Sequence, residues 1–351
     1  MVPNTKDSYL ITGGNGLLGR HIAKMLLERG ETSVAVFDIA PSAESDERII
    51  EFLGDVTNKG DLSNAVKKCN ATCIFHTAAL VQGAPRDAMF HVNVQGTQQV
   101  IAVARNYSVS KLVFTSSASV VFDGTDQDGV DETARYPETP FDDYNASKAE
   151  AERLVLAADE QYDVGLKTVS LRVAGLFGPG DRHAIPGFMN VLESGRTGMQ
   201  IGNNQNLFDF TYIPNAALAH LLAADRLSPS HPKYSFVHGE AFFITNGAPM
   251  PFWDFPRALW KEAGHVPTKI TVIPRFLAMI IAFFMEIWGW ITRTTPTLTR
   301  FRVTYVTTTR WCDITRAREA LDYEPKYSIE EGIRDSVEWW KESQQSREKK
   351  L

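Results

Sequence analysis

Two side chains four residues apart, Tyr144 and Lys148, are suited to acid–base chemistry. On a helix this spacing places both groups on one face, with the ammonium close to the phenol. Because a nearby positive charge stabilises a phenolate, we expect the pKa of Tyr144 to fall toward the working range. Upstream, Thr115, Ser116 and Ser117 end an apolar run, and their hydroxyls could bind a substrate oxygen. A Tyr-x-x-x-Lys pair alone arises by chance on many helices, so other motifs must support it.

A glycine-rich turn near the N-terminus is suited to binding a pyrophosphate. Residues 13–19 satisfy both G-x-x-G-x-x-G and G-x-G-x-x-G between an apolar run and a helical pattern. Glycine allows a sharp turn and a close backbone approach to the ligand, and the helix N-terminus supplies free N–H groups with partial positive charge. The turn therefore predicts a dinucleotide site. Its expected cofactor-binding residues are Gly13, Asn15, Gly16, Leu17, Leu18 and Gly19.

Asp38 indicates which dinucleotide is bound. It ends an apolar run 19 residues after Gly19, where a carboxylate can accept hydrogen bonds from both ribose hydroxyls. Residues 39–41 contain no Arg or Lys that would neutralise a 2′-phosphate. NAD is therefore favoured over NADP, and its positive nicotinamide would further stabilise a Tyr144 phenolate. The alternative for Asp38 is a solvated carboxylate at a strand end.

Short apolar runs alternate with longer helical patterns through the first half of the chain. This alternation predicts an α/β fold, a Rossmann-type doubly wound parallel sheet with helices on both faces. Residues 1–175 would form mainly the NAD-binding domain, and residues 176–351 mainly a smaller substrate-binding region interleaved with the sheet. The expected strands are 9–12, 33–38, 72–76, 111–115 and 167–171, and the expected helices are 17–29, 87–107 and 146–160.

Composition excludes several classes of protein. The 351 residues are 44% hydrophobic and 22% charged, which suits a globular chain of one or two domains. A net charge of −6 argues against binding nucleic acid as the main task. Cys69, Cys73 and Cys312 suit a reducing compartment, and their spacing predicts no metal site. The polar first nine residues lack the apolar core of a secretory signal.

Residues 276–292 form an apolar segment broken only by Glu286, a glycine and a threonine, and flanked by Arg275 and Arg293. A bilayer span needs about 20 apolar residues, and a carboxylate at its centre is costly. A buried core helix is a second alternative. The flanking arginines and two tryptophans favour a third, a helix at about 275–293 that lies in the membrane interface or acts as a lid.

In this order, the motifs resemble the extended short-chain dehydrogenase/reductase family over nearly the whole chain, and within it the 3β-hydroxysteroid dehydrogenase branch. A closer similarity is to fungal members of the branch that act on 4-carboxysterols, carried by residues 178–182, 200–209 and 239–246. Beyond the Gly-rich turn, Thr115–Ser117 and the Tyr–Lys pair, the family motifs are residues 54–56, 76–79, 93–97, 171–181 and 209–215.

The resemblance implies a role for each matching residue. Ser117 would hold the substrate oxygen, Tyr144 would be the acid/base, and Lys148 would bind the ribose and tune Tyr144. The remaining cofactor contacts would be Asp55 and Val56 at the adenine, Ala78 and Ala79 along the phosphate–ribose track, and Thr115 and Val173. Val173 stands where the family usually has proline. Because proline fixes φ and lacks an N–H, this departure predicts a reshaped nicotinamide pocket.

The implied activity is NAD-dependent oxidation of the 3β-hydroxyl of a 4-carboxysterol or related triterpenoid, with decarboxylation at C4. A dehydrogenase of a secondary triterpenoid or meroterpenoid pathway would carry the same motifs. A nucleotide-sugar epimerase or dehydratase would use the same trio, although no dense Arg cluster follows residue 180. A redox-sensing binding protein is the non-enzymatic alternative. The resemblance further implies the cytosolic face of the endoplasmic reticulum, or the cytoplasm, and a homodimer as a common assembly.

Overall fold

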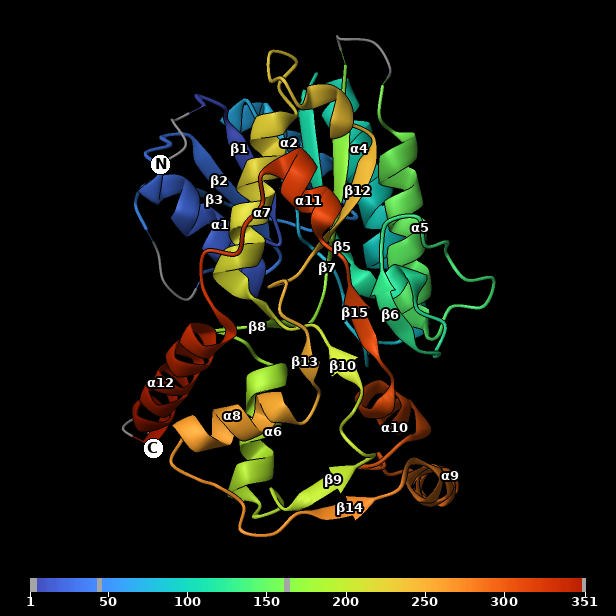
Figure 1. The fold of residues 1–351 in the computed structure, drawn as a ribbon. Coiled ribbons are helices and arrows are strands. Elements are labelled where there is room, and N and C mark those ends of the chain that lie inside the picture. Colours follow the sequence, from blue (N-terminus) through green and yellow to red (C-terminus); the bar gives the residue numbers. More distant parts are fainter. Residues whose placement is uncertain (1–4, 43–45, 161–164, 349–351) are drawn as a thin grey trace.

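The computed structural model describes residues 5–42, 46–160 and 165–348. A large sheet with helices on both faces lies above a smaller group of helices and short strands (Figure 1). The sheet confirms the predicted Rossmann-type fold. It has seven parallel strands in the order β12-β7-β5-β4-β1-β2-β3. They are β1 (Tyr9–Thr12), β2 (Val34–Asp38), β3 (Ile49–Leu53), β4 (Cys73–His76), β5 (Lys111–Ser117), β7 (Lys167–Val173) and β12 (Glu240–Ile244).

The winding reverses between β1 and β4, because β2 and β3 extend the sheet to one side and the later strands extend it to the other. Ligands of such sheets bind at this switch point, beyond the carboxyl ends of the strands. Two hydrophobic clusters cover the two faces. The helices on one face are α1 (Leu17–Glu28), α7 (Ile213–Arg226) and α11 (Thr315–Leu321), and those on the other are α2 (Lys59–Cys69), α4 (Thr97–Asn106) and α5 (Asp143–Ala157).

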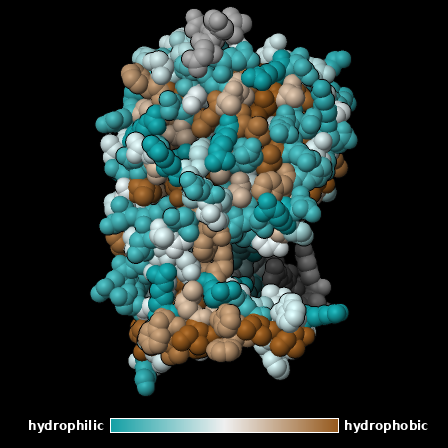
Figure 2. All heavy atoms as spheres, turned by 90° about the vertical axis from the view of Figure 1, so that its right-hand side faces the viewer, coloured by the Kyte–Doolittle hydropathy of each residue, from teal (hydrophilic) through white to brown (hydrophobic). Residues whose placement is uncertain are grey.

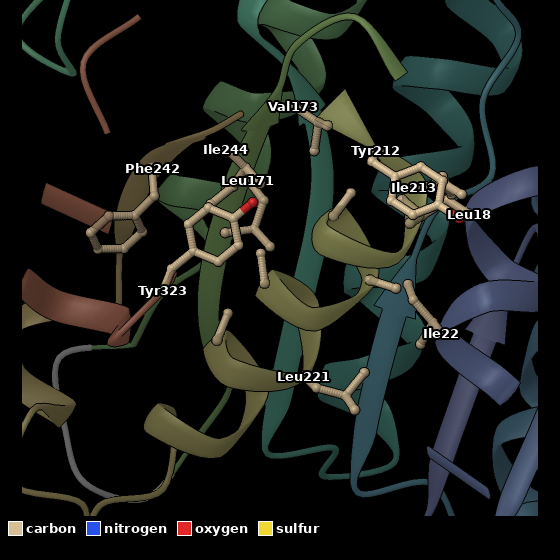
Figure 3. Packing of buried hydrophobic residues seen from close by; sticks show 14 of the residues in the cluster. Leu18, Ile22, Leu171, Val173, Tyr212, Ile213, Leu221, Phe242, Ile244 and Tyr323 are labelled. Atoms are coloured by element: carbon tan, nitrogen blue, oxygen red, sulfur yellow. The ribbon is translucent and has the colours of Figure 1, made fainter. Parts of the chain in front are cut away.

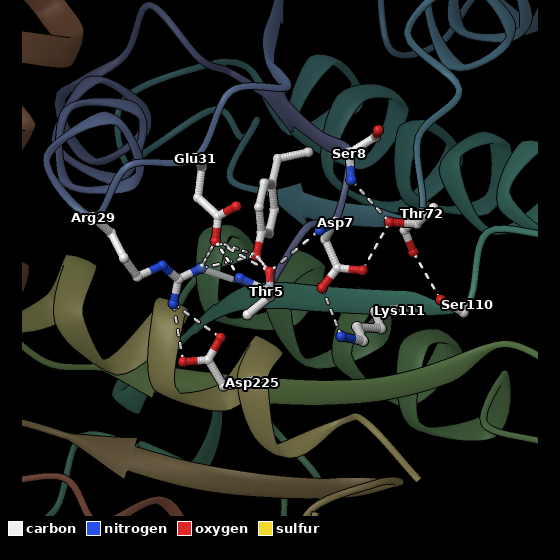
Figure 4. Close-up of polar contacts among 10 residues, drawn as sticks. Thr5, Asp7, Ser8, Arg29, Glu31, Thr72, Ser110, Lys111 and Asp225 are labelled. Carbon is white, nitrogen blue, oxygen red and sulfur yellow. Dashed lines mark hydrogen bonds and ion pairs between the residues drawn. The ribbon is translucent and has the colours of Figure 1, made fainter. Parts of the chain in front are cut away.

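The α1/α7 face is packed by aliphatic and aromatic side chains from widely separated segments. Figure 3 shows Leu18 of α1 beside Ile213 of α7 and Ile22 of α1 on the side of Leu221 of α7, and Leu171 of β7 belongs to the same cluster. At the amino ends of the strands, a buried ion pair joins the same two helices, since Arg29 donates to both carboxylate oxygens of Asp225 at 2.9 Å (Figure 4). This edge is therefore closed by packing and charge, and the carboxyl edge is the one left for a ligand.

Several predicted elements shift by a few residues or divide. The expected helix over 87–107 consists of α3 (Arg86–Phe90), a π-helical turn η1 (His91–Gly96) and α4. Strands β3 and β12 were not predicted. Strand β3 lies at the sheet edge with three of its five residues exposed, and β12 follows a region where the alternation of patterns is lost.

The smaller group is built from short elements between residues 176 and 348. A four-stranded sheet, β13-β10-β15-β6, joins it to the large sheet region. Its strands are β13 (Met250–Pro251), β10 (Leu207–Phe208), β15 (Arg310–Cys312) and β6 (Gln127–Val130). The other elements of this group are β8 (Leu176–Phe177), α6 (Ala184–Glu193), β9 (Met199–Ile201), β11 (Thr211–Tyr212), α8 (Asp254–Glu262), β14 (Thr271–Ile273), α9 (Arg275–Thr292), α10 (Arg300–Thr307) and α12 (Ile329–Glu348). Two short turns belong with the large sheet: η2 (Ala118–Val121) follows β5, and η3 (Tyr234–Phe236) precedes β12.

Helix α9 contains the apolar segment, and it is not a core helix. Its buried residues are Ala278, Ala282 and Gly289, whereas Trp290 is 83% exposed and Phe276 is 68% exposed. The helix forms part of an apolar band along the lower edge of the molecule (Figure 2). Among the described residues it is also the one helix that is long and apolar enough to cross a membrane, judged by length and composition.

Candidate functional site

The predicted site residues come from separate strands and meet at the carboxyl edge of the sheet. The Gly-rich turn follows β1, Asp38 ends β2, and Ala78 and Ala79 follow β4. Ser117 ends β5 and pairs in register with Val173, the last residue of β7. The order of the strands therefore brings the residues of the predicted constellation to the switch point, where a doubly wound sheet binds its ligand.

The Gly-rich turn has no room for side chains at the positions that would face a pyrophosphate. A Cβ on Gly13 would lie 2.7 Å from the Ala78 backbone, and one on Gly19 would lie 2.4 Å from the Gly13 carbonyl oxygen. Gly13 also has a φ of 68°, which favours glycine. Gly16 is the N-cap of α1 and supplies no side-chain cap, so the first N–H groups at Leu17 and Leu18 remain for a ligand.

Asp38 is half-buried beside this turn. Its carboxylate accepts hydrogen bonds from the backbone N–H of Asn15 at 3.0 Å and of Ala40 at 3.2 Å, which fixes its orientation. The Asn15 amide donates to Glu51 Oε1 at 2.7 Å, so a second carboxylate lies near the first. Sequence reasoning missed Glu51, because it lies on the unpredicted strand β3. Two negative charges at this position disfavour a 2′-phosphate, in agreement with the predicted preference for NAD.

The predicted adenine contacts differ in exposure. Val56 is buried against Gly96, and Asp55 is exposed, with its carboxylate accepting from the Thr57 N–H at 2.8 Å. Ala78 contacts the Gly-rich turn, and Ala79 is half-buried next to it. Together with the turn and Asp38, these residues fit an extended dinucleotide, and their roles as contacts stay predictions.

The catalytic candidates converge at the ends of β5 and α5. Asp142 caps α5 by accepting from the Asn145 N–H at 2.7 Å, which places Tyr144 in the first turn and Lys148 one turn later. The Lys148 ammonium is buried, donates to the Thr115 carbonyl oxygen at 2.7 Å, and lies 4.2 Å from the centre of the Phe114 ring.

The environment of Tyr144 contradicts the expected fall in its pKa. Burial, together with the charge of Asp142 and the phenol of Tyr305, raises the pKa of Tyr144 to about 12. A hydrogen bond from Ser117 opposes this rise. Burial lowers the pKa of Lys148 itself to about 7, with Glu152 opposing this shift. The expectation fails because burial of the phenol outweighs the groups that would stabilise a phenolate.

Two buried groups support the residues around the trio: His220, which the sequence did not indicate, and Asn93, the first residue of the 93–97 motif. His220 donates from Nδ1 to the Ala216 carbonyl oxygen at 2.7 Å, so its Nε2 accepts from the Thr115 hydroxyl at 2.8 Å. Asn93, in the π-helical turn, bonds to both backbone groups of Leu80 and donates to Ser147 at 3.0 Å. A π-helical turn within a helix often marks a functional site, and that pattern is visible only in the structure.

Other predicted features have defined places. Val173 is buried beside Ser117, and its effect on the nicotinamide pocket stays a prediction. The three cysteines are buried, unpaired thiols. Within the described ranges, no group of three or more His, Cys, Asp or Glu side chains could hold a metal ion.

Comparison with known proteins gives two kinds of match. The sequence model of the 3-beta hydroxysteroid dehydrogenase/isomerase family matches residues 10–275. The chain is 44% identical to a decarboxylating sterol-4-alpha-carboxylate 3-dehydrogenase of Schizosaccharomyces pombe, over 95% of this chain and 97% of the relative. It is 38% identical to the corresponding enzyme of Saccharomyces cerevisiae, over 96% and 98%.

Among solved structures, the fold matches UDP-glucose 4-epimerase of Thermus thermophilus in complex with NAD. The TM-score is 0.71 at 24% identity, covering 95% of this chain and 98% of the epimerase. At this identity the match concerns the fold.

Proposed function

The chain belongs to the 3-beta hydroxysteroid dehydrogenase/isomerase family, and from this premise we propose that it oxidises the 3β-hydroxyl of a 4-carboxysterol, or a related triterpenoid, to the 3-ketone with NAD, with loss of the C4 carboxylate. The observation that carries the proposal is the convergence of Ser117, Tyr144 and Lys148 beside the glycine turn and Asp38. Relatives of nearly equal length whose names state this reaction support it.

NAD would be held by the residues at the carboxyl edge, and when bound it supplies the acceptor for the hydride from C3. The backbone of the Gly-rich turn would contact the pyrophosphate, and Asp38 would accept from the adenosine ribose. Lys148, already placed one helical turn from Tyr144, would donate to the nicotinamide ribose. The close backbone packing that glycine allows at Gly13 and Gly19 gives the turn the compact shape that fits this group.

The chain's own residues then account for the proton. Ser117 orients the 3-hydroxyl, and the Tyr144 phenolate takes its proton as the C3–H bond breaks. Burial opposes this phenolate, so the positive nicotinamide must offset the raised pKa of Tyr144. The product is a β-keto acid. Its C4–carboxylate bond breaks, the electron pair moves to the C3 oxygen, and Ser117 and the protonated Tyr144 donate to that oxygen. A proton added at C4 completes the reaction.

The test is direct. Purified protein is incubated with NAD and a panel of 3β-hydroxy-4-carboxysterols and triterpenoids, with NADH followed by absorbance and CO2 by mass spectrometry. We expect NADH and CO2 in equal amounts from at least one member. The same panel separates a sterol enzyme from one of a secondary pathway. Turnover of a UDP-sugar in place of every panel member would assign the epimerase reaction instead.

We propose in addition that α9 attaches the protein to a membrane surface, which would place it on the cytosolic face of the endoplasmic reticulum. The exposed aromatic and aliphatic side chains of α9 support this, as they would lose contact with water in the interface. Glu286 does not oppose it, because its carboxylate accepts from the backbone N–H and from Nε of Arg300, each at 2.7 Å. A homodimer remains a prediction from the family resemblance.

A further inference from the structure

Arg310, the first residue of β15, is half-buried and has no acidic partner among the described residues. Its guanidinium lies 4.0 Å from the ring centre of Phe122, 5.0 Å from that of Tyr305 and 5.5 Å from that of Phe208. Within the described part of the chain, the guanidinium has no hydrogen bond and no ion pair. By contrast, arginines with nearly buried side chains each pair with a carboxylate: Arg29 with Asp225, Arg172 with Glu152, and Arg226 with Asp322.

This charge lies close to the reaction centre. Asp142 and Tyr305 act electrostatically both on Arg310 and on Tyr144, so the guanidinium and the phenol share their neighbours. Phe122, whose ring the guanidinium covers, directly follows η2, which begins after Ser117. Strand β15 reaches this position by pairing with β10 and β6.

The surroundings of Arg310 are aromatic. Phe141 contacts Phe122 and Phe301 at ring-centre distances of 4.9 and 5.1 Å, and Phe301 lies 6.1 Å from Tyr305. Asp142 acts electrostatically on Arg310, but one of its carboxylate oxygens already accepts from the Asn145 N–H at the start of α5. The guanidinium is therefore enclosed by aromatic rings and paired with no carboxylate of the described residues, and burial lowers the pKa of Arg310. A guanidinium whose N–H groups lack an acceptor can pair with the carboxylate of a ligand.

We propose that Arg310 is the counter-charge for the C4 carboxylate of the substrate, and that it selects 4-carboxysterols over sterols without this group. The inference rests on the proposed function and deepens it. C4 is bonded to C3, so a residue that binds the carboxylate must lie near the residue that takes the 3-hydroxyl proton, as Arg310 does near Tyr144. The aromatic wall suits the hydrocarbon rings, and the guanidinium matches a carboxylate in two parallel hydrogen bonds. After CO2 is lost, the product no longer holds the charge of Arg310, which favours its release.

The experiment compares a 3β-hydroxy-4-carboxysterol with its methyl ester, because both can be oxidised at C3 and only the acid is charged. NADH formation gives kcat/KM for each. We expect the wild type to prefer the acid by about 10- to 150-fold, the range of a hydrogen bond to a charged group. Arg310→Met should lower kcat/KM for the acid by about that factor and leave the ester unchanged. Arg310→Lys, which keeps the charge and loses the paired geometry, should retain part of the preference.

The matched control is Arg316→Met. Arg316 also lies over an aromatic ring, 5.2 Å from the centre of Phe242, but it pairs with Glu240 away from the trio. The Arg316→Met variant should leave the ratio of kcat/KM for the acid to kcat/KM for the ester unchanged. Equal losses for acid and ester in Arg310→Met would assign Arg310 a packing role and overturn the inference. If that variant does not fold, a wild type that treats acid and ester alike overturns it too. A wild type that oxidises neither sterol refutes the proposed function itself.

Discussion

In the proposed site the carboxylate of Asp38 would combine two effects, acceptance from the ribose hydroxyls and repulsion of a 2′-phosphate. Asp38→Ala removes both, so the ratio of kcat/KM with NAD to that with NADP should fall by at least about tenfold, equivalent to ~1.4 kcal/mol. Steady-state kinetics with both dinucleotides measures this. Glu51→Gln should cause a smaller fall, because Glu51 reaches the site through Asn15. A wild type that uses NADP as well as NAD would contradict the assignment.

The Tyr144 hydroxyl is the proton-transfer group in the proposed reaction. Tyr144→Phe should lower kcat by about 10²- to 10⁴-fold while the Kd for NAD, measured by calorimetry, stays nearly unchanged. Lys148→Ala should weaken both, since it removes a ribose donor as well as a neighbouring charge. A Tyr144→Phe variant that kept more than about a tenth of the activity would show that another group moves the proton.

The trio, the Gly-rich turn and Asp38 could be predicted because each is defined by local order: a motif, a spacing, or the end of an apolar run. Glu51, His220 and Arg310 could not, since each acts through a neighbour that is distant in sequence. The expected fall in the pKa of Tyr144 was wrong for a related reason. Four-residue spacing predicted the shared helical face, whereas burial of the phenol depends on the packed structure.

Helix α9 exposes its apolar side chains, so removing some of them should cost the fold little. Phe284, Trp288, Trp290 and Ile291 are all more than half exposed. Changing these four to Ser should abolish co-sedimentation with anionic phospholipid vesicles and leave the melting temperature within a few degrees.

The control for α9 changes two equally exposed apolar residues elsewhere, Ile39 and Val266, to Ser. This variant should still bind vesicles. Wild-type protein that stays in the supernatant at low salt would exclude membrane attachment, and a collapsed melt in the α9 variant would show that the helix supports the fold.

The helices of the first half were predictable because one face packs on the sheet, and the strands because they are buried on both faces and form continuous apolar runs. Strand β3 was missed since it is an edge strand that is mostly exposed, and β12 since its partner, β7, lies far back in the sequence. Likewise, composition showed that residues 276–292 are apolar, but only the structure shows that they lie outside the core.

The folded protein as a unit should lose stability in mild acid. Burial lowers the pKa of His76 to about 3 and that of His220 to about 4, both below the unfolded value of 6.5. Below pH 6.5 and above these lowered pKa values, the unfolded chain binds protons that the folded chain does not. The free energy of unfolding therefore decreases as the pH is lowered, by about 1 kcal/mol per histidine for each pH unit. Urea unfolding at pH 7 and pH 5 measures the loss. It should shrink in His220→Gln and persist in the surface control His91→Gln.

The pairing of β15 with β6 joins residues 310–312 to residues 127–130. Contacts of such long sequence separation form late, because a large loop must close first. During synthesis, the glycine turn, Asp38 and the Tyr–Lys pair can therefore assemble while the segment carrying Arg310 has yet to be made. Helix α9 is translated before β15 as well. The protein thus acquires its cofactor half first, presents its apolar helix next, and gains the residue we assign to substrate selection almost at the end of translation.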